Sequence, residues 1–294
     1  MGARDTLSDD TPSPVFGSDA HVFDFSARDF ERVRRIIFKL AGIDLNASKR
    51  NMVYSRLTRR LRACGVDSFS HYLDRLETSA AFASQERQEF VNSLTTNLTS
   101  FFREPHHFPI LTQFLKSCPA GQPVRVWCAA ASTGEEAYSI AMTIIEELGP
   151  ASAARVLATD IDTQVLASAG RGVYRDQAAL ACGDRRMRRF FLRGTGSNAG
   201  TVRVRPEVAD LVEFAQLNLL ESSWPLLDRF APRLDAVFCR NVMIYFNRAT
   251  QRAILERIAA VLRPGGLLFA GHSENFTDCR EWFVLRGRTV YEKL

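Results

Sequence analysis

The sequence predicts an α/β protein in which a small all-helical domain precedes a Rossmann-like domain built on a mostly parallel sheet. Three observations support this prediction. Apolar side chains recur at helical spacing through the N-terminal third, and short buried-strand patterns then alternate with amphipathic helices. Small residues fill the turn after the first of these strands, as in nucleotide-binding α/β folds. The chain of 294 residues is also long for a single hydrophobic core, which favours two domains.

The composition is that of an ordinary globular protein and excludes several classes. The chain is 46% hydrophobic and 24% charged, and no apolar run approaches the roughly 18 residues that span a bilayer. The N-terminus is polar and lacks a signal-peptide pattern. We therefore expect a cytoplasmic protein without direct membrane insertion, and a monomer as the default state.

The six cysteines and five histidines show no ligand spacing. Because no C-x-x-C pair occurs, reduced thiols in a cytoplasmic protein explain the cysteines better than a disulfide framework. His106 and His107 are adjacent, and adjacent side chains on a helix point about 100° apart, so this pair is a poor chelate. The sequence predicts no metal site.

The N-terminal part of the chain predicts a lead-in followed by helices. Residues 1–22 contain prolines and glycines and are predicted to be flexible, whereas residues 23–94 predict the small helical domain. The first helix begins at the N-cap candidate Ser26 and ends before Gly42. Three further helices are expected over residues 49–64, 68–76 and 85–94.

The second of these helices carries four cations beside its apolar stripe. Their positions fall within a sector of roughly 100° when residues are placed 100° apart, and their mutual repulsion favours an anionic surface facing them. A solvated basic face is the alternative. Nucleic acid would be favoured by interleaved aromatic side chains, and only Tyr54 is nearby, so the formal charge of +5 fits an acidic protein at least as well. The four cations are Lys49, Arg56, Arg59 and Arg60.

Residues 95–117 are predicted to be an inter-domain segment and the helix that follows it. The stretch T-T-N-L-T-S-F-F-R-E, residues 95–104, places small polar side chains and one arginine around Leu98, Phe101 and Phe102. A plain linker has no structural need for so many directed hydrogen-bonding groups. We expect this segment to lie over a bound polar ligand.

Residues 118–294 predict the Rossmann-like domain, which opens with a strand over 124–128, a turn of small residues and a helix over 135–148. Glu135 and Glu136 stand at the helix start, where they would repel a phosphate group. They suit a ligand that lacks phosphate and carries positive charge, as S-adenosylmethionine does through its ammonium and sulfonium groups. Alternatively, the two glutamates only favour the helix dipole.

The second strand, over residues 155–158, is followed by two aspartates. We expect Asp160 to accept hydrogen bonds from a ribose diol and Asp162 to cap the next helix. Two closing strand patterns around residues 286–288 supply the antiparallel strand that is typical of class I methyltransferases and absent from dehydrogenases. Further elements are expected over residues 235–239, 248–262 and 267–270.

Between about residues 188 and 215 the alternation of strands and helices breaks. A turn-rich loop over residues 193–200 lies between strand patterns at 202–204 and 211–214. We expect a small antiparallel β insert, whose edge could add a strand from an extended peptide. The alternative is a plain surface excursion.

From about residue 25 to its end, the chain resembles the chemotaxis receptor methyltransferases, the CheR family. The resemblance rests on five blocks in the expected order, which together are far more specific than a single glycine motif. One departure is Ala137, which replaces a proline common in its block and is mild at the first turn of a helix. The blocks cover residues 94–104, 125–142, 160–163, 238–246 and 267–276.

This resemblance implies the transfer of a methyl group from S-adenosylmethionine to specific glutamate side chains of chemoreceptors, leaving S-adenosylhomocysteine. Arg103 and Tyr245 match the positions expected nearest the reacting methyl group. The remaining matched positions are expected to hold the cofactor. The full cofactor set is Asn97, Thr99, Arg103, Glu136, Asp160, Asn218, Leu219, Arg240 and Asn241.

The resemblance also implies two surfaces for the substrate protein. The basic helix face matches the part of the family that meets the receptor's methylation helices, so its four cations are candidate substrate-binding residues. The β insert matches the part that docks on a short C-terminal peptide of some receptors. No nucleic acid partner is expected.

Three other functions are consistent with parts of the sequence. An RNA methyltransferase of the same fold would explain the pI near 9.0. A non-catalytic adaptor that binds S-adenosylmethionine is disfavoured because Arg103, Asp160, Asn241 and Tyr245 are all present. A nicotinamide oxidoreductase is disfavoured by the glutamates at the first helix of the Rossmann-like domain.

Overall fold

A computed structural model describes residues 23–119, 121–228 and 233–294. The predicted flexible lead-in over residues 1–22 lies outside these ranges. Within them, no helix is both long enough and apolar enough to cross a membrane.

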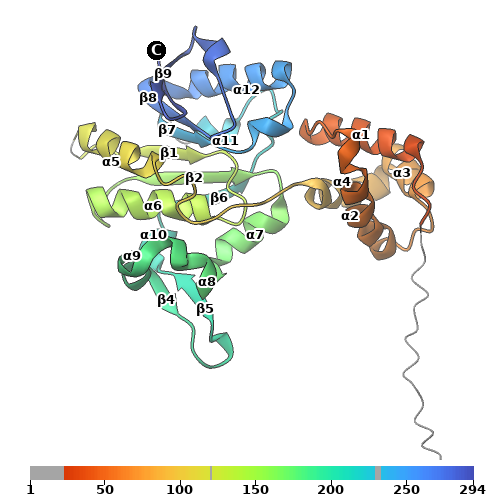
Figure 1. Ribbon diagram of the computed structural model, residues 1–294, viewed down its shortest axis with the longest axis horizontal. Coiled ribbons are helices and arrows are strands. Elements are labelled where there is room, and N and C mark those ends of the chain that lie inside the picture. Colours follow the sequence, from red (N-terminus) through yellow and green to blue (C-terminus); the bar gives the residue numbers. More distant parts are fainter. Residues whose placement is uncertain (1–22, 120, 229–232) are drawn as a thin grey trace, which may run out of the picture.

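Four helices form the N-terminal domain (Figure 1): α1 (Ala27–Ala41), α2 (Arg50–Ala63), α3 (Phe69–Thr78) and α4 (Ala80–Leu94). The predicted start of α1 is confirmed, because the Ser26 hydroxyl oxygen accepts a hydrogen bond from the Asp29 backbone N–H and the Asp29 carboxylate accepts one from the Ser26 backbone N–H. Gly42 ends the helix in the left-handed conformation, at a φ of 69°. The helices enclose their own core, which includes Val33, Leu57, Tyr72 and Phe90.

The second domain is built on a seven-stranded sheet with strand order β6-β2-β1-β7-β8-β10-β9. Strands β6, β2, β1, β7 and β8 are parallel, and β10 pairs antiparallel with both β8 and β9. The predicted closing antiparallel strand is therefore confirmed. The strands are β1 (Arg125–Cys128), β2 (Arg155–Asp160), β6 (Val212–Gln216), β7 (Leu234–Cys239), β8 (Leu262–Ala270), β9 (Phe283–Gly287) and β10 (Val290–Lys293).

Helices cover both faces of this sheet (Figure 1). Because side chains alternate along a strand, Val126 and Cys128 of β1 belong to one hydrophobic core and Trp127 to the other. The main helices are α5 (His107–Ser117), α6 (Glu135–Leu148), α7 (Thr163–Arg171) and α12 (Arg248–Val261), and the short ones are α8 (Asp176–Ala179), α9 (Gly183–Phe190), α10 (Pro206–Ala209) and α11 (Pro225–Asp228).

The β insert exists, but its predicted bounds of about 188–215 are wrong at both ends. It is a three-stranded antiparallel sheet with β5 (Thr201–Val204) between β3 (Val173–Arg175) and β4 (Phe191–Arg193). The pattern at residues 211–214, assigned to the insert, lies in β6, which pairs parallel with β2 at the edge of the main sheet. A short strand pattern carries no information about a partner so distant in sequence, and β3 has only three residues.

Hydrogen bonds fix the helical domain against the carboxyl edge of the sheet. The Asn218 side chain donates to the carbonyl oxygen of Leu40 at 2.8 Å, and the Asp44 backbone donates to the carbonyl oxygen of Tyr245 at 2.9 Å. On α4, Asn92 donates its side-chain amide to the Thr163 hydroxyl at 3.0 Å. The two domains are thus held together by hydrogen bonds beside a cavity.

Candidate functional site

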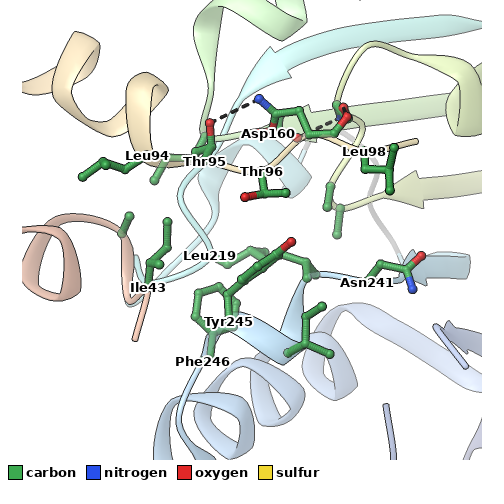
Figure 2. Close-up of a pocket in the computed structure, with 18 of the residues that line it drawn as sticks. Ile43, Leu94, Thr95, Thr96, Leu98, Asp160, Leu219, Asn241, Tyr245 and Phe246 are labelled. Carbon is green, nitrogen blue, oxygen red and sulfur yellow. Dashed lines mark hydrogen bonds between the residues drawn. The ribbon is translucent and has the colours of Figure 1, made fainter. Parts of the chain in front are cut away.

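A cavity of about 370 Å³ lies between the helical domain and the carboxyl ends of β1, β2 and β7 (Figure 2). All the residues predicted to bind the cofactor or to act in catalysis line it. Those that follow strands come together because the ends of parallel strands meet at one edge of the sheet, and the others come from α6, the inter-domain segment and the turn around Tyr245. Their individual roles remain predictions. These lining residues are Asn97, Thr99, Arg103, Glu136, Asp160, Asn218, Leu219, Arg240, Asn241 and Tyr245.

Asp160 stands at the end of β2 with its carboxylate held by two backbone groups. One oxygen accepts from the Ser132 N–H at 2.8 Å and the other from the Asp162 N–H at 3.0 Å. Burial raises the pKa of this carboxyl, although both backbone hydrogen bonds oppose the rise. Since a carboxylate offers about four lone-pair sites, a fixed acceptor remains for hydroxyl donors in the cavity.

The turn after β1 brings the backbone close to the cavity. Ser132 adopts a left-handed conformation at a φ of 49°, and its hydroxyl donates to the Asn97 carbonyl oxygen at 2.8 Å. Gly134 has a φ of 98°, and a Cβ there would lie 2.9 Å from both the Ala169 side chain and the Tyr174 hydroxyl. Only glycine fits this position without displacing its neighbours.

Asp162 anchors the inter-domain segment to the sheet. One carboxylate oxygen caps α7, as predicted, by accepting from the backbone of Gln164 and Val165. The other accepts from the Thr95 hydroxyl at 2.7 Å and from the Asn97 amide at 2.8 Å. The Asn97 amide therefore holds the segment in place. Sequence reasoning identified the cap but had no signal for the second pair of contacts.

A buried ion pair closes the floor of the cavity. The Arg240 Nε donates to Glu136 at 2.7 Å, and its two terminal nitrogens reach the His107 ring at 2.7 Å and the Arg103 carbonyl oxygen at 2.7 Å. The Arg240 side chain is fully buried, so each of these contacts offsets the cost of removing the guanidinium from water. The predicted negative charge of Glu136 is thus matched by Arg240. Glu135, the second glutamate at the start of α6, is bound by the Thr133 hydroxyl at 2.6 Å.

Glu104 and the two adjacent histidines lie close together behind this ion pair, with ligand atoms within 4.8 Å of one another. Both His107 ring nitrogens already have partners, since Nδ1 faces Arg240 and Nε2 faces the Arg288 carbonyl oxygen at 2.9 Å. Burial would raise the pKa of Glu104, but hydrogen bonds from His272 and the Arg240 charge outweigh it and lower the pKa to about 2. The group serves as a polar network around Arg240.

Glu274, which sequence reasoning missed as a determinant of the site, shapes the turn after β7. Its two oxygens accept four backbone hydrogen bonds: from Gly271 and Asn241 on one oxygen, and from Val242 and Met243 on the other. Asn241 is left-handed, at a φ of 57°, and a Cβ at Gly271 would overlap its side chain. The carboxylate therefore sets the backbone from which the cavity residues project. The stretch G-H-S-E-N lies in one of the five blocks that resemble the CheR family, but the resemblance predicts no role for its glutamate.

The two candidate catalytic residues enter the cavity from different elements. Figure 2 shows the Tyr245 ring extending into the cavity, with its hydroxyl directed to the side of Thr96 and Asp160. Arg103 lies in the inter-domain segment, and its guanidinium donates to the Leu98 carbonyl oxygen at 2.7 Å. The structure brings the two into one lining, as expected.

The predicted basic face on α2 is smaller than expected. Arg60 donates two hydrogen bonds to Glu86, at 2.6 and 2.9 Å, and the Arg56 guanidinium donates to the carbonyl oxygen of Thr95. The anionic surface expected opposite these cations is partly the chain's own helix α4. Of the other two cations, Lys49 is exposed and lines the cavity. Arg59 is exposed on α2.

Two family models match the chain in succession. The first, "CheR methyltransferase, all-alpha domain", matches residues 28–95, and the second, "CheR methyltransferase, SAM binding domain", matches residues 97–291. Together they cover the helical domain and the Rossmann-like domain.

Curated relatives agree with these family models over nearly the whole chain. Chemotaxis protein methyltransferase 2 of Pseudomonas aeruginosa is 50% identical over 96% of this chain and 98% of its own length. The chemotaxis protein methyltransferase of Escherichia coli is 51% identical over 93% of this chain and 91% of its own length. The protein of the same name from Salmonella typhimurium is 50% identical over 93% of this chain and 90% of its own length. The chain is therefore a member of the CheR family of chemotaxis methyltransferases, and S-adenosylmethionine is its cofactor.

Proposed function

We propose that the protein methylates glutamate side chains of chemoreceptors, giving glutamate 5-O-methyl esters and S-adenosylhomocysteine. The observation that supports this most is the common cavity, in which every residue matched to the family's cofactor and catalytic positions is found. The names of the relatives place the methylation in chemotaxis. Adaptation of the chemotactic response is the process that such methyl esters would serve.

The cavity residues fit S-adenosylmethionine in their chemistry. Asp160 offers a fixed acceptor for the ribose hydroxyls, and Glu136, beside Arg240, would face the amino-acid end. Two glutamate side chains occupy the start of α6, where a phosphate-binding helix presents free backbone N–H groups, and Arg240 matches the charge of Glu136. When bound, the cofactor supplies an activated methyl group on a sulfonium; everything else must come from the chain.

The acceptor needs little activation by the protein. A glutamate carboxylate has an ordinary pKa near ~4.3, so it is already an anionic nucleophile at neutral pH and no general base is required. The protein's task is to align the acceptor with the methyl group, a contribution worth several kcal/mol in favourable cases. We assign to Arg103 the steering of the incoming carboxylate, and to the Tyr245 hydroxyl its orientation at the methyl group.

Two surfaces are candidates for binding the receptor itself. Lys49 is exposed and lines the cavity, and Arg59 is exposed on α2. Both cations would attract an acidic helix of the receptor. The β insert and its flanks, residues 171–205, contain nine arginines against two aspartates, a formal charge of +7. The insert also leaves β3 and β4 as edge strands. These features support the docking of an acidic peptide tail as an added strand.

Incubation with labelled methyl donor and receptor-containing membranes tests the proposal. We expect label on the receptor that leaves as methanol in mild base, because esters hydrolyse there and N-methyl groups do not. Base-stable label on protein or RNA would contradict the assignment. Salt dependence separates the RNA methyltransferase alternative, whose activity would fall steeply as salt is raised.

A further inference from the structure

Leu98, at the mouth of the cavity, is an exposed leucine on a fixed backbone. Its relative exposure is 78%, the highest among the large hydrophobic residues in the described part of the chain. The carbonyl oxygen before it accepts from the Ser132 hydroxyl at 2.8 Å, and its own carbonyl oxygen accepts from Arg103 at 2.7 Å. The neighbouring Asn97 amide is held by Asp162. The exposure therefore does not come from a loose loop.

A second apolar residue of the cavity lining is also exposed. Ile244 lines the same cavity, is 50% exposed, and directly precedes Tyr245. In the view of Figure 2, Leu98 lies at the opposite end of the cavity from Ile43 and Leu94, which come from the helical domain and its junction. The cavity lining thus includes two exposed apolar side chains in addition to its carboxylates and amide groups.

Leu98 contributes little to folding in this arrangement, because most of its apolar surface remains in water, and Ile244 leaves half of its surface there. A leucine held in place before binding can bury that surface against a partner without the cost of ordering a loop. A few well-packed residues near the centre of an interface commonly carry most of its affinity.

We propose that Leu98 anchors the methyl-accepting protein, by packing against an apolar side chain next to the target carboxylate. This inference rests on the proposed function and names its substrate surface: an amphipathic segment with an acidic residue flanked by aliphatic ones. The cations Lys49 and Arg59 would attract such a segment from a distance, and Leu98 would hold it at contact range. S-adenosylmethionine is less suited than the protein substrate to cover Leu98, because the polar groups of the cofactor match the polar side chains of Asp160 and Glu136.

Steady-state kinetics with receptor-containing membranes as the varied substrate test this role. For Leu98→Ala we expect the KM for receptor to rise about tenfold, because about three carbon groups are lost from an apolar contact. The kcat, the Kd for S-adenosylhomocysteine and the melting temperature should stay within experimental error of the wild-type values. Leu98→Met, which keeps the apolar volume, should restore the KM to within about twofold.

Leu285→Ala is the matched control. Leu285 is an exposed leucine on β9, at the far edge of the sheet from the cavity wall, and its replacement should leave the KM unchanged. An unchanged KM in Leu98→Ala would refute the anchor while leaving methyl transfer intact. A parallel rise in the Kd for S-adenosylhomocysteine would also refute it, by making Leu98 part of the cofactor site. If the wild-type protein transfers no methyl group to receptor, both the proposed function and the anchor fail.

Discussion

Loss of stability in mild acid should come largely from His107, a buried histidine beside the cavity floor. Its Nδ1 accepts a hydrogen bond from Arg240 at 2.7 Å, and its Nε2 then donates to the Arg288 carbonyl oxygen at 2.9 Å. Protonation would place a proton on Nδ1, break the first contact and set two cations against each other. Glu104 and His106 also face the ring, the first favouring and the second opposing its charged form.

The size of the effect follows from the pKa of this ring. Burial, and then the positive charge of Arg240, lower the pKa of His107 from 6.5 to about 4. The unfolded chain takes up a proton at the higher pKa and the folded chain does not. Stability is therefore fully present above pH 6.5 and falls as the pH drops from 6.5 towards 4, by up to about 3 kcal/mol. Glu104 loses its contribution only below pH 4.5, as the pH approaches its pKa of about 2.

Urea denaturation across this pH range, on the wild type and His107→Gln, measures the contribution. A glutamine side chain can accept a hydrogen bond from Arg240 but does not titrate. The free energy of unfolding of His107→Gln should therefore fall less than that of the wild type between about pH 6.5 and 4.5. The exposed His71 provides the control, because His71→Gln should keep the full wild-type slope. Equal slopes for the wild type and His107→Gln would refute the assignment.

Four further substitutions test the site. Tyr245→Phe and Arg103→Ala should each lower methyl transfer by roughly 100-fold, and calorimetry should show that Tyr245→Phe still binds S-adenosylhomocysteine; unchanged turnover in both would remove them from the reaction. Glu274→Gln should lower the free energy of unfolding by about 3 kcal/mol, since an amide nitrogen would face two of the four backbone donors; a loss as small as in the exposed Glu281→Gln would contradict this. Asp162→Asn should weaken S-adenosylhomocysteine binding about tenfold. The amide oxygen can still cap α7, but the amide nitrogen cannot accept hydrogen bonds from Thr95 and Asn97. Unaltered affinity would show that the inter-domain segment needs no anchor.

Elements set by local patterns were predicted well from the sequence. The helix Glu135–Leu148 matches its prediction at both ends, and the Asp162 cap is present. Both depend on neighbours within a few residues, such as the glycine after a helix or a carboxylate before one. The resemblance to the CheR family named residues that the structure brings into one cavity, and those that follow strands meet there because the carboxyl ends of parallel strands lie at one edge of the sheet.

Predictions failed where the deciding contact was distant in the chain. Residues 211–214 were assigned to the insert because a strand pattern does not reveal its partner, which is β2. Arg60 was expected to be available to a partner protein, yet Glu86 on α4 binds it. The periodicity of α2 alone could not show that α4 places the Glu86 carboxylate opposite Arg60.

By itself, the sequence determined the order and type of most elements, since helical spacing, caps and strand ends are local properties, and its resemblance to a family named the residues that would gather in one cavity. Only the tertiary structure decided what those residues do to one another. It pairs Glu136 with Arg240, ties Asn97 to Asp162, wraps the turn after β7 around Glu274 and leaves Leu98 facing water. The physical reason is that hydrogen bonds and burial act over a few ångströms in space, between residues whose separation along the chain carries no trace of that proximity.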